Sequence, residues 1–168
     1  MKSCYSPMTP VGGVPSGQSA VRTARRAIAM EIIRSTPQTA SAPSDWFTGR
    51  AYIDEIAPAD SPSRLRAYQV HFTPGARTGW HKHPNGQVIH VTEGVGLAQR
   101  RGGGVEQIRA GDTVRFDAGE DHWHGAAPGH FMTHLALHEA DEDGNDAYWG
   151  EKVSDEEYFA GSPDERAT

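Results

Sequence analysis

The sequence lacks cysteine pairs, long hydrophobic runs and an excess of basic residues, and these absences exclude several classes of protein. Cys4 is the one cysteine among 168 residues, so no disulfide can form within the chain and we expect a reducing, cytoplasmic compartment. No apolar run approaches the roughly 20 residues that a membrane-spanning helix needs. With three lysines and a formal net charge of −6, a nucleic-acid surface is not expected.

Length and turn-forming residues favour one domain built from many short strands. A chain of 168 residues is long enough for a sizeable single core, and its 19 glycines and 11 prolines suit frequent turns. Residues 1–29 contain no acidic residue and no apolar stretch of the kind that a secretory signal has. We expect them to be a disordered extension, and Arg25-Arg26 without a following apolar run disfavours a targeting segment.

Alternating polar and apolar residues predict strands along most of the remaining chain. The segments predicted as strands are Glu31–Arg34, Trp46–Asp54, Leu65–Phe72, Gln87–Thr92, Gly96–Arg101, Val105–Arg109, Thr113–Asp117, Glu120–Ala126 and His130–Glu139. Composition predicts loops at Ser41–Ser44 and Ala57–Ser63. Ser154 followed by Glu157 is a capping box that opens a short helix through Phe159, and we expect Tyr158 and Phe159 to hold this helix against the strands.

Histidine is concentrated in the middle of the chain, where all nine residues lie between His71 and His138. His81 and His83 are two apart, so on an extended strand they point to the same side. Gln87 follows a Pro84-Asn85-Gly86 turn that can bring a third donor beside them. A second glycine-bounded stretch, GDTVRFDAGEDH, supplies His122 as a fourth donor. Three imidazoles and one amide oxygen predict a neutral, partly open site for a borderline divalent ion.

The two stretches GARTGWHKHPNGQVIHVTEG and GDTVRFDAGEDH resemble the paired motifs of the cupin superfamily. The resemblance implies an all-β, single-domain jelly-roll barrel with a metal inside, spanning residues 30–168 and ending in the short helix. Gln87 stands where most cupins have Glu. With this glutamine, the stretches AQRRGGGVEQIRAGD, GEDHWHGAAP and MTHLALHE are similar to bacterial cupin-type (R)-selective hydroxynitrile lyases, which use manganese.

That narrower resemblance implies roles for further residues in a substrate pocket. It implies His81, His83, Gln87 and His122 as ligands of one divalent ion, with Mn²⁺ as the first choice and Fe²⁺, Ni²⁺ or Zn²⁺ as alternatives. It places His134 in the pocket, where a neutral imidazole can act as general base. His124 shares a face with His122 across Trp123, so we expect it to point inward and to assist His134.

Four other residues complete the predicted pocket. Tyr68 and Val70 share the strand face that we expect to be interior. A tyrosine at this position either packs in the core or lines the pocket, where it narrows the cavity or adds a phenol and so disfavours bulky aromatic cyanohydrins. Thr78, just before the two histidine ligands, can donate a hydrogen bond to a bound molecule. His138 stands where the lyases are expected to have Gln and adds another imidazole. Trp80 and Trp123 point away from the ligands by alternation, and His71, His90 and His130 are expected at the surface.

A metal-dependent lyase that cleaves and forms the carbon–carbon bond of cyanohydrins is the favoured hypothesis for function. An iron-dependent dioxygenase acting on a small molecule is a second, because some cupin dioxygenases use three or four histidines. A metal-dependent binding module without catalysis is the third. In each case the partner is a small molecule rather than nucleic acid or membrane. Exposed apolar strand faces with Trp46, Trp80 or Trp149 would suit a homodimer or homotetramer.

Overall fold

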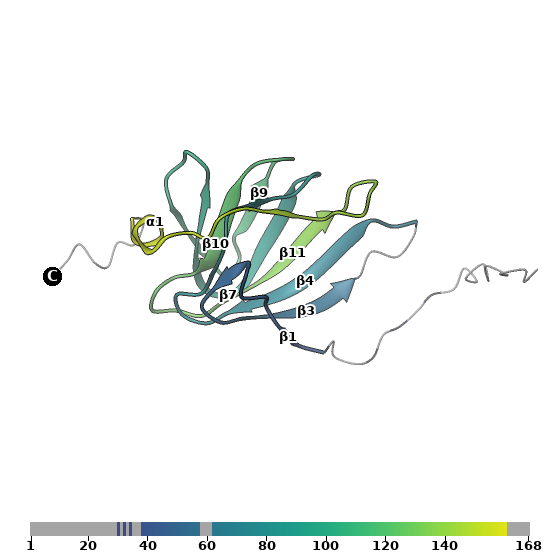
Figure 1. The fold of residues 1–168 in the computed structure, drawn as a ribbon. Coiled ribbons are helices and arrows are strands. Elements are labelled where there is room, and N and C mark those ends of the chain that lie inside the picture. The colour runs from purple at the N-terminus through teal and green to yellow at the C-terminus, as the bar shows by residue number, and fades with distance from the viewer. Residues whose placement is uncertain (1–29, 31, 33, 35–37, 58–61, 161–168) are drawn as a thin grey trace, which may run out of the picture. The chain divides into compact units, whose positions relative to one another are not determined.

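The computed structural model describes Met30, Ile32, Arg34 and residues 38–57 and 62–160 (Figure 1). It separates the chain into two compact units, residues 1–34 and 35–168, and the strands and helix described below all lie in the second unit. The predicted extension, residues 1–29, lies outside the described residues. Within the described part of the chain, no helix is long and apolar enough to cross a membrane.

Strands are the main secondary structure of the second unit, and its described residues end in a single short helix. The elements are β1 Ala40–Ser41, β2 Phe47–Thr48, β3 Ala51–Ala57, β4 Leu65–Phe72, β5 Arg77–Thr78, β6 His81–Lys82, β7 Gln87–Arg100, β8 Glu106–Arg109, β9 Thr113–Phe116, β10 His122–Ala126, β11 Met132–Glu139, β12 Tyr148–Trp149 and α1 Asp155–Phe159. The predicted all-β class and the helix are confirmed.

The strands form one curved antiparallel sheet in the order β1-β3-β4-β11-β7-β10-β5-β2, and Figure 1 shows β4, β11 and β7 side by side. Strand β7 belongs to both halves of this sheet. Its first part pairs with β11 and β9, and its second part pairs with β10 and β8. The sheet therefore curls about β7 and encloses the interior in which the predicted site lies.

The bend within β7 corrects one sequence prediction. Gln87–Thr92 and Gly96–Arg101 were expected to be separate strands turned by Gly94, but they are one strand of 14 residues. Gly94 has φ +78°, a value that L side chains rarely adopt, so the chain bends there without leaving the sheet. Conversely, the single strand expected at Trp46–Asp54 is interrupted at Gly49, where φ is +76°. Of the strand expected at Glu31–Arg34, Glu31 and Ile33 lie outside the described residues, and neither Ile32 nor Arg34 lies in a strand, which contradicts the prediction for those two residues.

The inner faces of β4 and β11 carry the residues of the predicted pocket. On β4, Val70 and Phe72 are buried and Tyr68 is half-buried, as the alternation predicts. On β11, His134, Ala136 and His138 are buried, while Leu137 is exposed. The imidazoles rather than the leucines therefore face inward, as the family resemblance implies and hydrophobicity alone does not.

A second cluster of buried side chains packs on the outer side of the sheet. It consists of Trp80, Leu97, Trp123, Ala127, Val153 and Tyr158. Tyr158 from α1 donates a hydrogen bond to the main-chain oxygen of Ala126 at 2.6 Å. The capping box of α1 and the anchoring role of Tyr158 are confirmed, whereas Phe159 stays 37% exposed.

The C-terminal segment of the same chain thus covers both tryptophans that flank the ligand motifs. Trp80 and Trp123 point away from the predicted ligands, as expected, and are 3% and 0% exposed. The suggestion that Trp80 lies on an exposed strand face is therefore wrong. Trp46 is 43% exposed, and the homodimer or homotetramer stays a prediction.

Substituting Gly94 by alanine should strongly destabilise the fold. A Cβ there would lie 1.8 Å from the main-chain oxygen of Phe131, in addition to the strain of a positive φ. Gly102 has the same φ, +78°, with no atom within 4 Å of its hypothetical Cβ, so it is a matched control for strain alone. In urea unfolding, Gly102→Ala should cost about 1 kcal/mol and Gly94→Ala about 3 kcal/mol or more. Equal losses would contradict the proposed close contact at the bend.

Candidate metal centre

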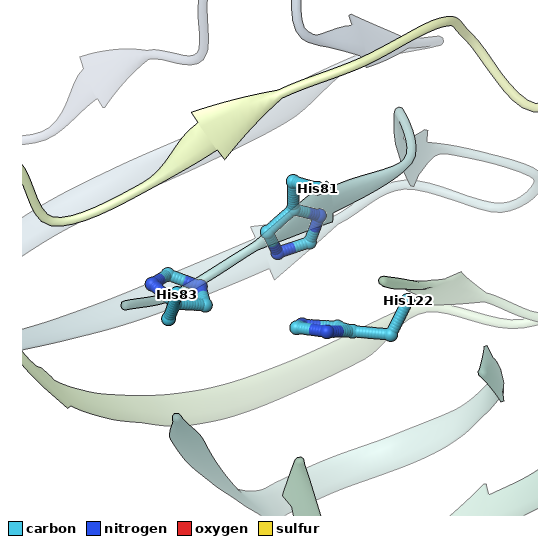
Figure 2. Close-up of side chains that lie close together, drawn as sticks. All are labelled: His81, His83 and His122. Carbon is cyan, nitrogen blue, oxygen red and sulfur yellow. The ribbon is translucent and has the colours of Figure 1, made fainter. Parts of the chain in front are cut away.

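The three predicted histidine ligands lie together inside the curved sheet. His81 on β6 is the register partner of His122 at the start of β10, and His83 follows one residue after β6. All three are buried, with exposures of 2% or less. Each offers a ring nitrogen, and these nitrogens lie within 4.8 Å of one another. Figure 2 shows the three rings grouped around one space.

Main-chain carbonyl groups fix which nitrogen of each ring faces that space. The Nδ1 atom of His81 lies 3.0 Å from the oxygen of Gly79, and that of His122 lies 2.8 Å from the oxygen of Glu120. The Nδ1 atom of His83 likewise contacts the oxygen of Asp146. A carbonyl oxygen only accepts, so each Nδ1 carries the hydrogen and donates it. Each Nε2 therefore keeps a lone pair, which is the form that binds a metal.

Acceptor atoms in the site that face no hydrogen-bond donor indicate a place for a cation. The Nε2 atom of His83 is buried and has no hydrogen-bond partner among the described residues. Gln87, 5% exposed at the start of β7, places its Oε1 atom 3.1 Å from the Nε2 atom of His122. Because both of these atoms are acceptors in this arrangement, a cation beside them satisfies both. The donor set therefore fits a divalent metal ion.

Burial keeps these imidazoles neutral. It lowers the pKa of His83 to about 3 and that of His122 to about 4, and it lowers the pKa of His81 well below its ordinary value. Neighbouring imidazoles lower the pKa of His81 further. Neutral histidine is the ligand form, so at neutral pH no proton has to leave before the metal binds.

Aromatic rings hold two of the ligand planes in place. Phe116 stacks on His122 with ring centroids 3.6 Å apart, and Trp149 stacks on His81 at 4.6 Å. Trp46 in turn lies parallel to Trp149 at 5.0 Å. Sequence reasoning gave neither Trp46 nor Trp149 a place at the site, because stacking between segments this far apart leaves no local sequence signal.

A cavity of about 450 Å³ adjoins the three-histidine cluster through His83. Every residue predicted for the pocket or for catalysis contributes to its wall, as do Gln87 and His83. These predicted residues are Tyr68, Val70, Thr78, His124, His134 and His138. The wall also includes apolar residues that were not predicted, among them Ile53 and Phe47. The structure thus brings the predicted set together, while the roles of its members stay predictions.

His124 and His134 form a pair within this cavity. The Nε2 atom of His134 lies 3.2 Å from the Nδ1 atom of His124. Burial lowers the pKa of His134 to about 4 and that of His124 well below its ordinary value, so both rings are neutral near pH 7. Their outer nitrogens, Nδ1 of His134 and Nε2 of His124, are buried without partners among the described residues. Two polar atoms thus stay available to a bound molecule.

Thr78 and Tyr68 occupy the positions predicted for them. The hydroxyl oxygen of Thr78 accepts a hydrogen bond from the main-chain N–H of His124 at 3.1 Å, so its own hydrogen can be donated elsewhere. The ring of Tyr68 stacks on His138 with centroids 5.7 Å apart. The pKa of Tyr68 is raised, mainly by burial, so the phenol keeps its proton at neutral pH.

The three histidines predicted to lie at the surface are exposed to different degrees. His130 is exposed, and the Nδ1 atom of His90 contacts the hydroxyl of Thr113 at 2.9 Å. The side chain of His71 is 37% exposed and lies 3.1 Å from a carboxylate oxygen of Asp54. None of the three lines the cavity, so their exclusion from the site agrees with the structure.

Comparison with known proteins supports one family. Residues 68–135 match the cupin domain family. The chain is also 52% identical over 130 residues to a protein from Granulicella tundricola named (R)-mandelonitrile lyase, which covers 77% of this chain and 98% of that protein. The chain belongs to the cupin family.

Solved cupin structures share its architecture. A cupin-like protein from Thermotoga maritima superposes with a TM-score of 0.71 at 32% identity, covering 80% of this chain and 99% of the other. The polyketide cyclase RemF from Streptomyces resistomycificus superposes with a TM-score of 0.61, covering 79% of this chain and 92% of the other. At 16% identity, this second likeness supports the fold alone.

Replacing one ligand should remove the metal without unfolding the protein. His83→Ala deletes the ring whose Nε2 atom lacks a partner, so we expect metal affinity to fall by at least about 100-fold while the circular dichroism spectrum stays that of a folded β protein. His90→Ala, outside the cavity, is the control and should keep its metal. Elemental analysis after dialysis measures the bound ion, and full metal content in His83→Ala would refute the site.

The metal-free protein should lose stability in acid. The pKa of His122 and that of His134 are both lowered to about 4, against an ordinary value of 6.5 in the unfolded chain. Below pH 6.5 the unfolded chain therefore binds more protons, and the free energy of unfolding falls as pH drops towards 4. Between pH 7 and pH 5 each of these histidines should cost about 2 kcal/mol.

Urea unfolding of the metal-free protein at the two pH values measures this loss. The variant His134→Gln, which has no titrating ring, should show a smaller difference than the unsubstituted protein. An unfolding free energy that does not change between pH 7 and pH 5 would mean that these rings are not held neutral by burial.

Proposed function

We propose that this cupin is a metal-dependent lyase that cleaves and forms the carbon–carbon bond of cyanohydrins. The observation that carries the proposal is one cavity lined by His83, Gln87 and the His124–His134 pair, where His83 is one of three histidines whose ring nitrogens lie within 4.8 Å of one another. The 52% identity to a protein named (R)-mandelonitrile lyase, across 98% of its length, supports the cyanide chemistry. Manganese is our first choice of metal, with iron, nickel and zinc as alternatives.

His81, His83, Gln87 and His122 would hold the ion. When bound, a divalent ion supplies Lewis acidity and lowers the pKa of a substrate hydroxyl beside it. All four ligands are neutral, since Gln87 stands in place of a carboxylate and burial keeps the imidazoles unprotonated. The ligands therefore leave the positive charge uncompensated, which favours binding of an anionic oxygen and disfavours the two-histidine, one-carboxylate pattern of many iron oxygenases.

The His124–His134 pair can both accept and release a proton. Two neutral imidazoles that share one hydrogen bond always leave one outer nitrogen protonated and the other with a lone pair. This holds whichever ring donates across the 3.2 Å contact. The pair can thus take a proton at one outer nitrogen and return one from the other, which is the exchange that cyanohydrin cleavage requires.

In the proposed reaction His134 removes the hydroxyl proton of the cyanohydrin, assisted by His124. The oxygen–hydrogen electron pair becomes the second bond of the carbonyl group. The bond to the nitrile carbon breaks, and its electron pair leaves with cyanide. Protonation of cyanide from the histidine pair gives hydrogen cyanide and an aldehyde or ketone. Synthesis of the cyanohydrin follows the same steps in reverse.

The cavity also bears on the size of the substrate. Tyr68 was expected to narrow it and so to disfavour bulky aromatic cyanohydrins. A volume of about 450 Å³ remains beside its ring, which is within the range of cavities that take drug-sized ligands. We infer that an aryl cyanohydrin fits, with Tyr68 determining how its ring is placed rather than excluding it.

Cyanide release tests the proposal directly. The protein is stripped of metal and reloaded separately with manganese, iron and zinc, and cyanide is measured from mandelonitrile and from a smaller aliphatic cyanohydrin. We expect metal-dependent release, and a fall in kcat/KM of about 10²–10⁴-fold in His134→Ala, because the general base is lost. His71→Ala, on the outer face of the sheet, is the control and should keep its activity.

Other results would point to the competing hypotheses. No cyanide release with any metal would refute the lyase while leaving the metal site in place. Oxygen uptake by the iron-loaded protein with catechol-like substrates would then favour a dioxygenase. Tight binding of a small molecule without turnover would favour a binding module.

A further inference from the structure

One carboxylate at the cavity wall, that of Asp146, was not singled out from the sequence. Asp146 precedes β12 and lines the cavity. Its main-chain oxygen accepts the hydrogen bond from the Nδ1 atom of the ligand His83. Its side-chain oxygen Oδ2 lies 3.5 Å from the Nε2 atom of His138 and 3.6 Å from the Nε atom of Arg66. One residue thus contacts both a metal ligand and a pocket histidine.

His138 is held on several sides. It is 9% exposed, its ring lies 4.2 Å from the ring of His83 and stacks on Tyr68, and its register partners are Arg66 on β4 and Gln87 on β7. Its Nδ1 atom is buried and has no partner among the described residues. A buried, unpartnered nitrogen on a cavity wall is costly unless a bound molecule satisfies it.

The carboxylate of Asp146 determines the tautomer of His138, and therefore whether its Nδ1 atom donates or accepts a hydrogen bond. An ionised carboxylate only accepts hydrogen bonds, so the hydrogen of His138 resides on Nε2, and Nδ1 keeps a lone pair. The Nε atom of Arg66 lies 3.6 Å from the same Oδ2 atom, and its positive charge favours the ionised carboxylate.

We propose that Asp146 is a positioning residue that presents the Nδ1 atom of His138 to the cavity as a hydrogen-bond acceptor for the substrate hydroxyl. The ring of His138 lies beside that of His83, so this acceptor belongs to the same cavity wall as one of the proposed metal ligands. The proposal deepens the proposed function and rests on it for the identity of the substrate. It assigns His138 to holding the hydroxyl group on binding. Because the hydroxyl has a single hydrogen, that hydrogen turns from His138 to His134 before the His124–His134 pair removes it.

The variant Asp146→Asn tests this assignment. Asparagine keeps the main-chain oxygen that orients His83, so metal content should not change. Its amide can donate to the Nε2 atom of His138, which moves the ring hydrogen to Nδ1 and removes the acceptor. Glu142→Gln is the matched control, because it removes the same charge from an exposed residue of the same segment.

Two readouts do not depend on turnover. In zinc-loaded protein labelled with ¹⁵N-histidine, the His138 signals, assigned by their loss in His138→Gln, should show Nε2 protonated. In Asp146→Asn they should show Nδ1 protonated. Titration with 1-phenylethanol, which carries the hydroxyl group but no nitrile to lose, should give a dissociation constant about 10-fold higher in Asp146→Asn than in Glu142→Gln, as the loss of one buried hydrogen bond predicts.

Each outcome decides for or against the proposal. An unchanged His138 spectrum in Asp146→Asn, or equal dissociation constants in the two variants, would overturn it. A loss of zinc in Asp146→Asn would also overturn it, because Asp146 would then act through the metal site rather than through His138. Failure of the lyase proposal is a separate result, since it appears as absent cyanide release in the unsubstituted protein while the spectrum of His138 is unaffected.

Discussion

Three hydrogen bonds from imidazole Nδ1 atoms to main-chain oxygens govern the rest of the site. The oxygens belong to Gly79, Glu120 and Asp146, and each comes from a segment that the sheet or its connections hold in place. Because these oxygens cannot donate, they fix the ring tautomers and turn the three Nε2 lone pairs inward. The backbone thus prepares the ligands before any ion arrives, and the chemistry of the cavity depends on that arrangement.

The neutral interior follows from the same burial that shapes the fold. Imidazoles in contact with Phe72, Phe116 and Trp149 have pKa values lowered mainly by desolvation, so they bind metal or protons as neutral groups. The same burial costs stability wherever a nitrogen stays without a partner. A ligand that supplies partners for these nitrogens therefore stabilises the folded protein, as a ligand that binds only the folded state does in general.

The parts of the site that sequence could predict are those set by local geometry. His81 and His83 were assigned together because strand side chains alternate with a period of two, and His122 was assigned from its place after a glycine-bounded turn. The inward orientation of His134 needed the family resemblance, because Leu135 and Leu137 gave the opposite hydrophobic signal. In the fold, the bend at Gly94 was predicted to be a turn between two strands. A glycine marks both a turn that ends a strand and a bend within a continuous strand, so the sequence does not distinguish the two.

Contacts between distant segments could not be predicted. Asp146 meets His83 and His138, and Trp149 stacks on His81, only because the chain after β11 returns to pair β12 with β6. No spacing or composition encodes that return. It nevertheless supplies one of the three oxygens that orient the ligands, so the C-terminal segment is part of the metal centre as well as a cover for Trp80 and Trp123.

X-ray absorption spectroscopy of the manganese-loaded protein tests the central claim most directly, because it reports the atoms around the ion without reference to any reaction. We predict three imidazole ligands, with oxygen atoms completing the coordination. A spectrum with fewer imidazoles, or with oxygen ligands alone, would show that the carbonyl-oriented histidines are not the metal site and would contradict the account.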